Sequence, residues 1–123
     1  MCIRDRDEGT SYHYLPADAS AVISKDLLDQ FQTGKTSEEP IWFSAKSWTT
    51  DAPYRETQSA IDNMAEAGVT CVEMEAAALY AFAQAKNKKV LCFAHLTNTM
   101  AQEEGDFEKG EKQIFWYSPY WLK

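Results

Sequence analysis

The sequence predicts an α/β fold, in which helices pack on a sheet that contains parallel strands. Strand-like and helix-like segments alternate through residues 53–96, the rhythm of a parallel sheet with right-handed crossovers. A strand-like run over residues 69–74 passes into an alanine-rich helix with no glycine or proline between them. With 123 residues and 45% apolar content, the chain can bury one modest core, so we expect one domain.

The first half of the chain predicts a strand, a helix and a second strand. Residues 1–6 show no periodicity and resemble translated adapter sequence of assembled environmental reads, so we set them aside as an artefactual leader. We therefore expect the chain to be the carboxyl-terminal part of a longer protein. Residues 10–15 are aromatic and β-branched and predict a strand that a proline closes. A helix should run from an N-cap at Ser24 to Gly34, followed by a strand over residues 41–46.

The second half predicts two helices alternating with two strands. Pro53 fits the first turn of a helix, and Gly68 fits its end. A strand over residues 69–74, a helix over 75–86 and a strand over 89–96 follow. This order is the reason for the parallel sheet in the predicted fold.

The composition narrows the classes of partner. The net charge is 12 − 19 = −7, without a lysine or arginine cluster, which argues against nucleic acid. Cys2, Cys71 and Cys92 give no disulfide framework, and the last two read as buried thiols in a reducing compartment. His13 and His95 have no partners at ligand spacing, so we expect no metal site. No apolar run reaches membrane-spanning length and no signal peptide is seen, so we expect no membrane partner and a cytoplasmic location.

Two carboxylates, Glu73 and Glu75, flank Met74 where the predicted strand becomes a helix. In α/β proteins, ligands bind outside the carboxyl ends of the strands. A carboxylate there has two oxygens that can accept from two vicinal hydroxyls, which a ribose 2′,3′-diol offers. The alternative is that both glutamates are favourable first-turn charges for the helix dipole, and the chemistry alone leaves both interpretations open.

The wording of this segment resembles a known signature. VEMEAAALYAFA, residues 72–83, is similar to the ribose-binding motif of the nucleoside phosphorylase family, which includes purine and uridine phosphorylases and related nucleosidases. Residues 7–16 resemble the family's strand and turn before the base pocket, and residues 43–51 resemble its base-pocket segment. Residues 96–100 resemble the strand end that faces the leaving base. Among the members of this family, the chain most closely resembles the uridine phosphorylases.

The resemblance implies a fold and a domain organisation. We expect a three-layer αβα sandwich of the nucleoside phosphorylase type with a mixed sheet, truncated at its N-terminus. Residues 7–111 would form the carboxyl-terminal part of the phosphorylase domain. Family members end in a long amphipathic helix, whereas residues 112–123 are aromatic and interrupted by proline, so we interpret them as an atypical tail.

The resemblance also implies site residues. Glu75 would bind the ribose diol, and Met74 would pack under the sugar. Trp48 lies at the position of an aromatic residue that stacks on the base or the ribose in the family, with a core tryptophan as the alternative. The catalytic residues would be Glu75 and Asn98, and the substrate-binding residues Glu73, Met74, Glu75, Trp48, Arg55, Gln58 and Thr97.

Arg55 and Gln58 lie three residues apart on a predicted helix and would share a face. A guanidinium and an amide suit the polar edge of uracil. Uridine phosphorylases use a Gln-x-Arg pair for this, whereas the order and spacing differ here. An exposed arginine on a solvated helix is the alternative.

Asn98 discriminates between the substrates. Purine phosphorylases resemble one another in having an aspartic acid at the matching position, which protonates N7 of the leaving purine. An amide can hydrogen-bond but cannot act as a general acid, and a pyrimidine leaves without protonation at N7. Asn98 therefore favours uridine.

The expected reaction transfers the pentosyl group of a nucleoside from its base to phosphate, which gives ribose 1-phosphate and free base. No cofactor is needed, and phosphate is the co-substrate. The glycines at 9, 34, 68, 105 and 110 form no phosphate-cradling loop, and the family's phosphate-binding residues lie upstream of residue 7. The fragment itself is therefore expected to be inactive, and the full-length protein to be a homo-oligomer. The alternatives are a purine phosphorylase, a hydrolytic nucleosidase, or a non-catalytic nucleoside-binding fragment.

Overall fold

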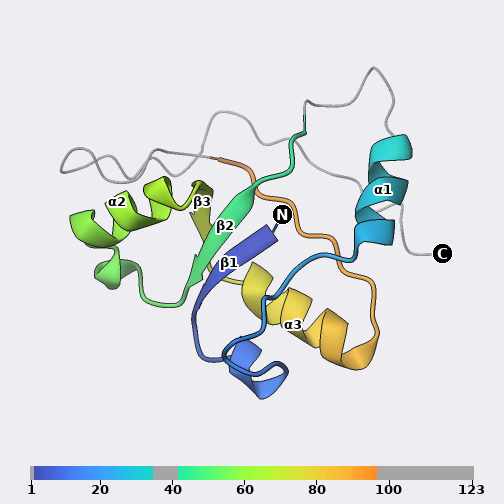
Figure 1. The fold of residues 1–123 in the computed structure, drawn as a ribbon, viewed down its shortest axis with the longest axis horizontal. Helices are drawn as coiled ribbons and strands as arrows, with labels where there is room; N and C mark the ends of the chain where they lie inside the picture. Colours follow the sequence, from blue (N-terminus) through green and yellow to red (C-terminus); the bar gives the residue numbers. More distant parts are fainter. Residues whose placement is uncertain (1, 35–41, 97–123) are drawn as a thin grey trace.

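The structure, a computed structural model, describes residues 2–34 and 42–96 (Figure 1). Its strands and helices alternate along the chain, as the sequence predicts for an α/β protein. The elements, in order, are β1 (Cys2–Asp7), the 3₁₀ turn η1 (Ser11–His13), α1 (Lys25–Thr33), β2 (Lys46–Thr50), the 3₁₀ turn η2 (Pro53–Arg55), α2 (Gln58–Glu66), β3 (Val69–Glu73) and α3 (Ala76–Lys86).

The three strands form a parallel sheet in the order β1-β2-β3, so β2 is central. Asp7 pairs with Thr50, and Thr49 pairs with Glu73, which brings the carboxyl ends of all three strands to the same edge. Every strand pair within residues 2–34 and 42–96 is parallel. The mixed sheet and the three-layer sandwich therefore stay expectations.

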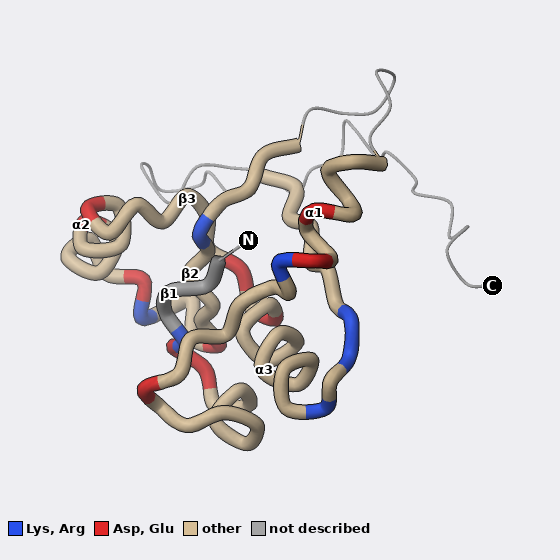
Figure 2. The backbone as a smooth tube through the Cα atoms, turned by 45° about the vertical axis from the view of Figure 1, so that its right-hand side comes forward, with Lys and Arg blue, Asp and Glu red and all other residues tan. Residues whose placement is uncertain are grey.

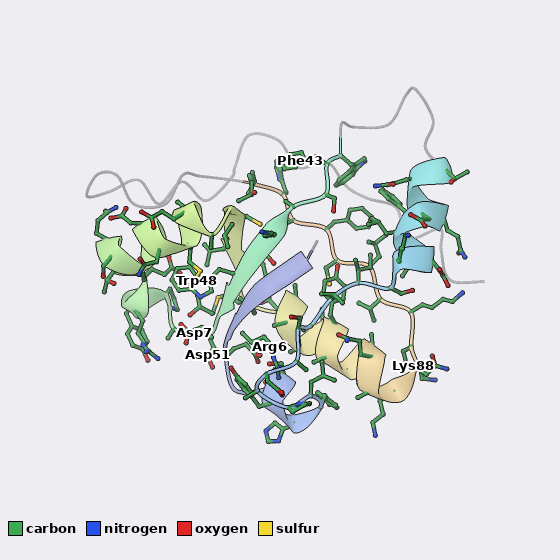
Figure 3. All side chains as sticks on the ribbon, viewed as in Figure 1. Arg6, Asp7, Phe43, Trp48, Asp51 and Lys88 are labelled. Carbon is green, nitrogen blue, oxygen red and sulfur yellow. The ribbon has the colours of Figure 1, made fainter. Side chains whose placement is uncertain are left out.

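The two long helices after β2 cover opposite faces of the sheet. Thr49 accepts a hydrogen bond from the backbone N–H of Ala77 in α3, so its side chain faces α3. Trp48 points to the other face, because successive side chains of a strand alternate. On that face it lines a cavity together with Ala60 and Met64 of α2, and Figure 3 shows it between β2 and α2.

The main core lies against α3. Buried side chains of α3 pack against the segment that precedes α1, and partly buried residues of the segment after α3 close the cluster. Its buried members are Ala21, Ile23, Ala76, Ala77, Tyr80 and Ala81. Among the described residues, Tyr80 is the largest fully buried side chain. The alanines of α3 allow the helix to lie close to its neighbours, which explains the alanine-rich composition of this segment.

Both ends of α1 and the end of α2 are confirmed, but the predicted helix start at Pro53 is wrong, because Pro53 lies in η2 and α2 begins at Gln58. Helix α1 begins after Ser24 and ends at Gly34, as predicted. Gly68 follows α2 with a φ of 76°, a left-handed conformation that glycine adopts without a steric penalty. Strand β3 and helix α3 match the predicted elements to within one residue.

Residues 2–6, which the sequence analysis excluded from the fold as part of a leader, belong to the sheet, so this exclusion is corrected. Residues 2–6 form most of β1, and Arg6 is buried, with 6% of its surface exposed. The Arg6 guanidinium lies 4.4 Å from the centre of the Tyr12 ring and holds the following loop in place. Its hydrogen-bond acceptors are the Ser11 hydroxyl (2.9 Å) and the carbonyls of Pro16 (2.6 Å), Ala19 (2.7 Å) and Leu15 (3.0 Å).

The strand predicted over residues 10–15 is wrong, because this segment contains the 3₁₀ turn η1. The Glu8 carboxylate accepts from the backbone N–H groups of Thr10 (2.6 Å) and Ser11 (3.0 Å). These bonds turn the chain immediately after β1. The Arg6 guanidinium then donates hydrogen bonds to the carbonyls of Leu15 and Pro16, which holds the end of this segment against β1. An aromatic, β-branched composition cannot show either contact.

Two other predicted strands are also corrected. The strand expected over residues 41–46 lies later, as β2, because its register with β1 and β3 begins at Lys46. The strand expected over residues 89–96 is not formed. In this segment the backbone N–H of Cys92 donates to the Tyr80 hydroxyl of α3 (3.0 Å).

Charged residues are distributed over many elements (Figure 2). Lysines 86, 88 and 89 lie at the end of α3 and just after it, where a positive charge favours the helix dipole. Within the described ranges, no helix has both the length and the apolar character needed to cross a membrane.

Candidate functional site

The junction between β3 and α3 has the geometry that the sequence predicts. The strand ends at Glu73 and the helix begins at Ala76, with Glu75 as the N-cap residue. Both carboxylates therefore lie at the carboxyl edge of the sheet, where ligands bind in parallel α/β folds.

The Glu73 carboxylate is engaged with the protein. Its Oε2 atom accepts from the backbone N–H groups of Glu75 (2.9 Å) and Ala76 (2.6 Å). Its Oε1 atom accepts a hydrogen bond from the Thr49 hydroxyl of the neighbouring strand. Glu73 thus caps the first turn of α3, which corresponds to the helix-charge interpretation that the sequence left open for this residue.

The Glu75 side chain has a different environment. It makes no capping hydrogen bond, is exposed, and has no side-chain partner among residues 2–34 and 42–96. Met74, beside it, is 48% exposed. A carboxylate with both oxygens unoccupied beside an apolar thioether can accept two vicinal hydroxyls of a sugar.

Trp48 lies in the interior, with 3% of its surface exposed. It faces α2, whereas its neighbour Thr49 faces the Glu73 side of the sheet. Its indole N–H has no acceptor in the described part of the chain. This burial is typical of a core tryptophan, the alternative given for this residue, and its role in stacking on a base stays a prediction.

A cavity of about 590 Å³ opens between the sheet and the α2 side. Trp48 and Arg55 both line it, so the structure brings together these two predicted base contacts. Tyr12 and Tyr54 also line it and are 48% and 86% exposed. The other lining residues are Arg6, Asp7, Thr57, Ala60 and Met64.

Arg55 and Gln58 do not share one helix, which corrects the predicted pair. Pro53 starts the turn η2, which contains Arg55, whereas Gln58 opens α2 after the N-cap Thr57. Gln58 donates to Asp62 Oδ1 (2.9 Å) and does not line the cavity. A short turn and a capped helix replace the single continuous helix that the spacing assumed.

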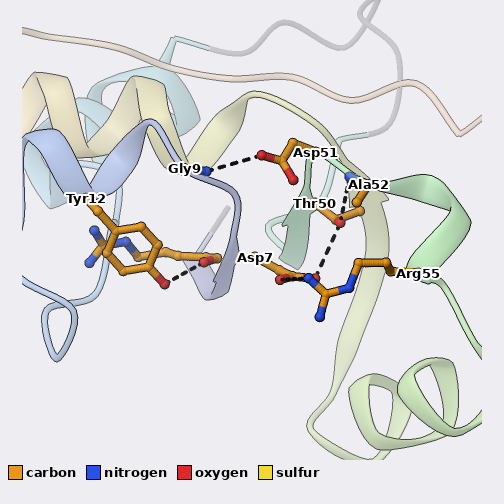
Figure 4. A network of polar contacts seen from close by, with 8 residues as sticks. Asp7, Gly9, Tyr12, Thr50, Asp51, Ala52 and Arg55 are labelled. Atoms are coloured by element: carbon orange, nitrogen blue, oxygen red, sulfur yellow. Dashed lines mark hydrogen bonds and ion pairs between the residues drawn. The ribbon is translucent and has the colours of Figure 1, made fainter.

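Polar contacts join the ends of β1 and β2 beside this cavity (Figure 4). Arg55 lies 3.8 Å from Asp7 in an ion pair, and the side chains of these residues are 66% and 35% exposed. Asp7 Oδ2 also accepts from the Thr50 hydroxyl (3.5 Å), and Asp51 accepts from the backbone N–H of Gly9 (3.3 Å). The sequence did not single out Asp7 and Asp51, although Asp7 ends β1 and Asp51 follows β2.

Burial sets the protonation of the groups behind the junction. It raises the pKa of the Tyr80 hydroxyl and of the Cys92 thiol, and the negative charge of Glu73 raises both further. Burial is also the main cause of the raised pKa of Cys71, to which Glu73 adds. The tyrosine and the two thiols are therefore neutral near pH 7, and the charged groups at the β3–α3 junction are the two glutamate carboxylates.

Thr97 and Asn98, the predicted contacts to the leaving base, lie outside the described residues. Among residues 2–34 and 42–96, no group of three potential metal-binding side chains is present.

The comparisons with known proteins identify the superfamily of the chain. The family model of the phosphorylase superfamily matches residues 1–115, so the chain belongs to that superfamily. The match extends over the β3–α3 junction, the segment whose sequence resembles the family's ribose-binding motif. The comparisons with curated proteins and with solved structures gave no match.

Proposed function

We propose that this chain supplies the sugar and base contacts of a nucleoside phosphorylase that prefers uridine. In the reaction, the bond between C1′ and the base nitrogen breaks, and its electron pair leaves with the base. A phosphate oxygen forms the new bond to C1′, which gives ribose 1-phosphate. The observation that carries the proposal is the unoccupied Glu75 carboxylate, placed at the carboxyl edge of the sheet in a member of the phosphorylase superfamily.

Glu75 would act in two ways. Its two oxygens would accept from the 2′- and 3′-hydroxyls and hold the sugar in one orientation, with Met74 under the ring. As the glycosidic bond breaks, positive charge develops on the sugar, and a carboxylate near the ring stabilises that charge. Because the second effect grows in the transition state, it raises kcat, whereas the first effect contributes to affinity for the substrate.

The preference for uridine rests on Asn98, with Thr97 as its neighbour. An amide offers hydrogen bonds to a pyrimidine that leaves as an anion, but it cannot protonate N7 of a purine. Arg55 would contribute a charged donor near the base from the wall of the cavity that Trp48 also lines.

Other parts of the proposal follow from the resemblance to nucleoside phosphorylases. Phosphate would bind to residues upstream of residue 7, no cofactor would take part, and the complete protein would be a cytoplasmic homo-oligomer with a three-layer sandwich fold. These points stay predictions.

The test is an assay of the complete protein with uridine, in the presence and absence of phosphate. We expect release of uracil only with phosphate, together with ribose 1-phosphate in equal amount. Release of uracil and free ribose without phosphate would replace the proposal by a hydrolytic nucleosidase. Faster cleavage of inosine than of uridine would replace it by a purine phosphorylase.

A further inference from the structure

The two glutamates of the β3–α3 junction have separate tasks. Glu73 is half-buried and uses both carboxylate oxygens within the protein, whereas Glu75 is exposed and uses neither among the described residues. A carboxylate that already accepts three hydrogen bonds has little remaining capacity for a sugar diol.

Thr49 connects this junction to the centre of the sheet. Its side chain is fully buried, and its register partner across the β2–β3 pair is Glu73. The hydroxyl donates its one proton to Glu73 and accepts from the backbone N–H of Ala77 (3.1 Å). No freely rotating donor is left, so the direction of the hydroxyl is fixed by its two partners.

Together, Thr49 and Glu73 occupy the amide groups that start α3. The N–H groups of Glu75 and Ala76 go to Glu73, and that of Ala77 goes to Thr49. These three bonds hold the backbone on both sides of the Glu75 Cα atom. They therefore determine the direction in which the Glu75 side chain leaves the chain.

We propose that Thr49 and Glu73 are positioning residues that orient Glu75 toward the ribose, and that Glu73 is not itself a ligand of the sugar. The inference rests on the proposed function, because it assumes that Glu75 binds the diol. Thr49 fits this role because a single hydroxyl can donate to the carboxylate and accept from the amide at once, whereas valine, which has the same shape, can do neither.

The test compares the affinity of the 123-residue chain for uridine and for 2′-deoxyuridine by NMR titration, following the Glu75 amide signal. The unmodified chain should prefer uridine by about tenfold or more, the usual effect of a hydrogen bond to a charged group. The Thr49→Val variant should lose most of this preference and fall below about threefold. Thr49→Ser, which restores the hydroxyl, should recover it.

Thr50→Val is the matched control. Thr50 is an equally buried threonine of the same strand, but its hydroxyl contacts Asp7 and the backbone N–H of Ala52, and it makes no contact with Glu73. This variant should keep the preference for uridine. If Thr49→Val and Thr50→Val lose the preference for uridine equally, the effect is a general one on the strand, and the positioning role of Thr49 is overturned.

If Thr49→Val does not fold, Glu73→Gln serves instead. The amide oxygen can still accept from the N–H groups of Glu75 and Ala76, but the amide nitrogen cannot accept the Thr49 proton. A reduced preference for uridine in this variant supports the inference, and an unchanged preference overturns it.

Hydrogen exchange separates this inference from the proposed function. The Ala77 amide should exchange at least about tenfold faster in Thr49→Val than in Thr49→Ser. If the unmodified chain shows no preference for uridine, the assigned role of Glu75 fails, and the exchange rates still decide whether Thr49 holds the helix start. If the chain prefers uridine and Thr49→Val retains that preference, only the positioning role fails.

Discussion

The hydroxyl of Tyr80 accepts a hydrogen bond from the backbone N–H of Cys92 at 3.0 Å. This contact ties the middle of α3 to the segment that follows it, in the place of the strand pairing that the sequence predicted. Tyr80 is fully buried, and its pKa is raised, mainly by burial.

Tyr80→Phe should lower the free energy of unfolding by about 1 kcal/mol at pH 7, because the Cys92 N–H loses its acceptor. The unmodified chain should lose stability as the pH rises above 10.0, the ordinary pKa of tyrosine. The sign follows from ionisation: the unfolded chain releases the phenol proton there, whereas the folded chain retains it. Tyr80→Phe should remove this part of the alkaline loss. Urea unfolding between pH 7 and pH 11 measures both effects.

Tyr54→Phe is the control, since Tyr54 is 86% exposed. It should change neither the stability at pH 7 nor the alkaline loss. The half-buried thiols of Cys71 and Cys92, whose pKa values are also raised, should contribute a further loss of stability above pH 9.0, so a smaller decline is expected to remain in Tyr80→Phe.

Arg6→Lys should destabilise the chain by about 2–4 kcal/mol, because an ammonium group cannot serve the four acceptors around the buried guanidinium. Arg55→Lys, at an exposed side chain, should change stability by less than about 0.5 kcal/mol. Thermal and urea unfolding measure the difference. Equal effects at the two arginines would contradict the placement of Arg6 in the fold.

Gly68→Ala should destabilise the chain by about 1 kcal/mol because of its positive φ. An added Cβ would meet Lys46 Nζ at 3.8 Å, an ordinary contact, so the cost is conformational. Gly34→Ala tests this reason, since Gly34 ends α1 at a φ of −80°. It should leave stability unchanged or raise it by up to about 1 kcal/mol. A loss at both positions would indicate a steric cause.

Glu75→Gln in the complete protein should reduce kcat/KM for uridine about 10–100-fold more than for 2′-deoxyuridine, because a hydrogen bond to a charged group is lost only with the riboside. Glu66→Gln, the same exchange at an exposed position in the last turn of α2, is the control. It should leave kcat/KM for both substrates unchanged. Equal losses on both substrates in Glu75→Gln would contradict the role in binding the diol.

Asn98→Asp in the complete protein should raise activity toward inosine relative to uridine, since a carboxylic acid can protonate N7. The measurement is the ratio of the two kcat/KM values in both forms. Asn63→Asp adds the same charge at an exposed position of α2 and should leave the ratio unchanged. A preference of the unmodified protein for inosine would contradict the assignment of uridine.

The features that the sequence predicts well are local ones. Ser24 and Gly34 bound α1, Gly68 follows α2, and the passage from β3 into α3 occurs within two residues. Each signal depends on the conformational preference or the capping chemistry of neighbouring residues, which sequence alone displays.

The features that it misses depend on distant partners. Strand β2 has three buried polar residues, Ser47, Thr49 and Thr50. A pattern of apolar residues therefore does not identify it as a buried strand. The sequence does not decide whether Glu73 binds a ligand or caps the helix, because its hydrogen-bond partner Thr49 lies 24 residues earlier in the chain. The 3₁₀ turn after β1 likewise depends on the buried Arg6.

The parallel sheet has a consequence for the way in which the chain acquires its structure. Asp7 meets Thr50 across 43 residues, and Thr49 meets Glu73 across 24, so no two described strands are joined by a tight hairpin. Each pairing must close a long loop before it gains any contact, which slows folding. During synthesis, β1 leaves the ribosome well before its only described neighbour, β2. Its unpaired edge is then open to association with other chains until β2 arrives.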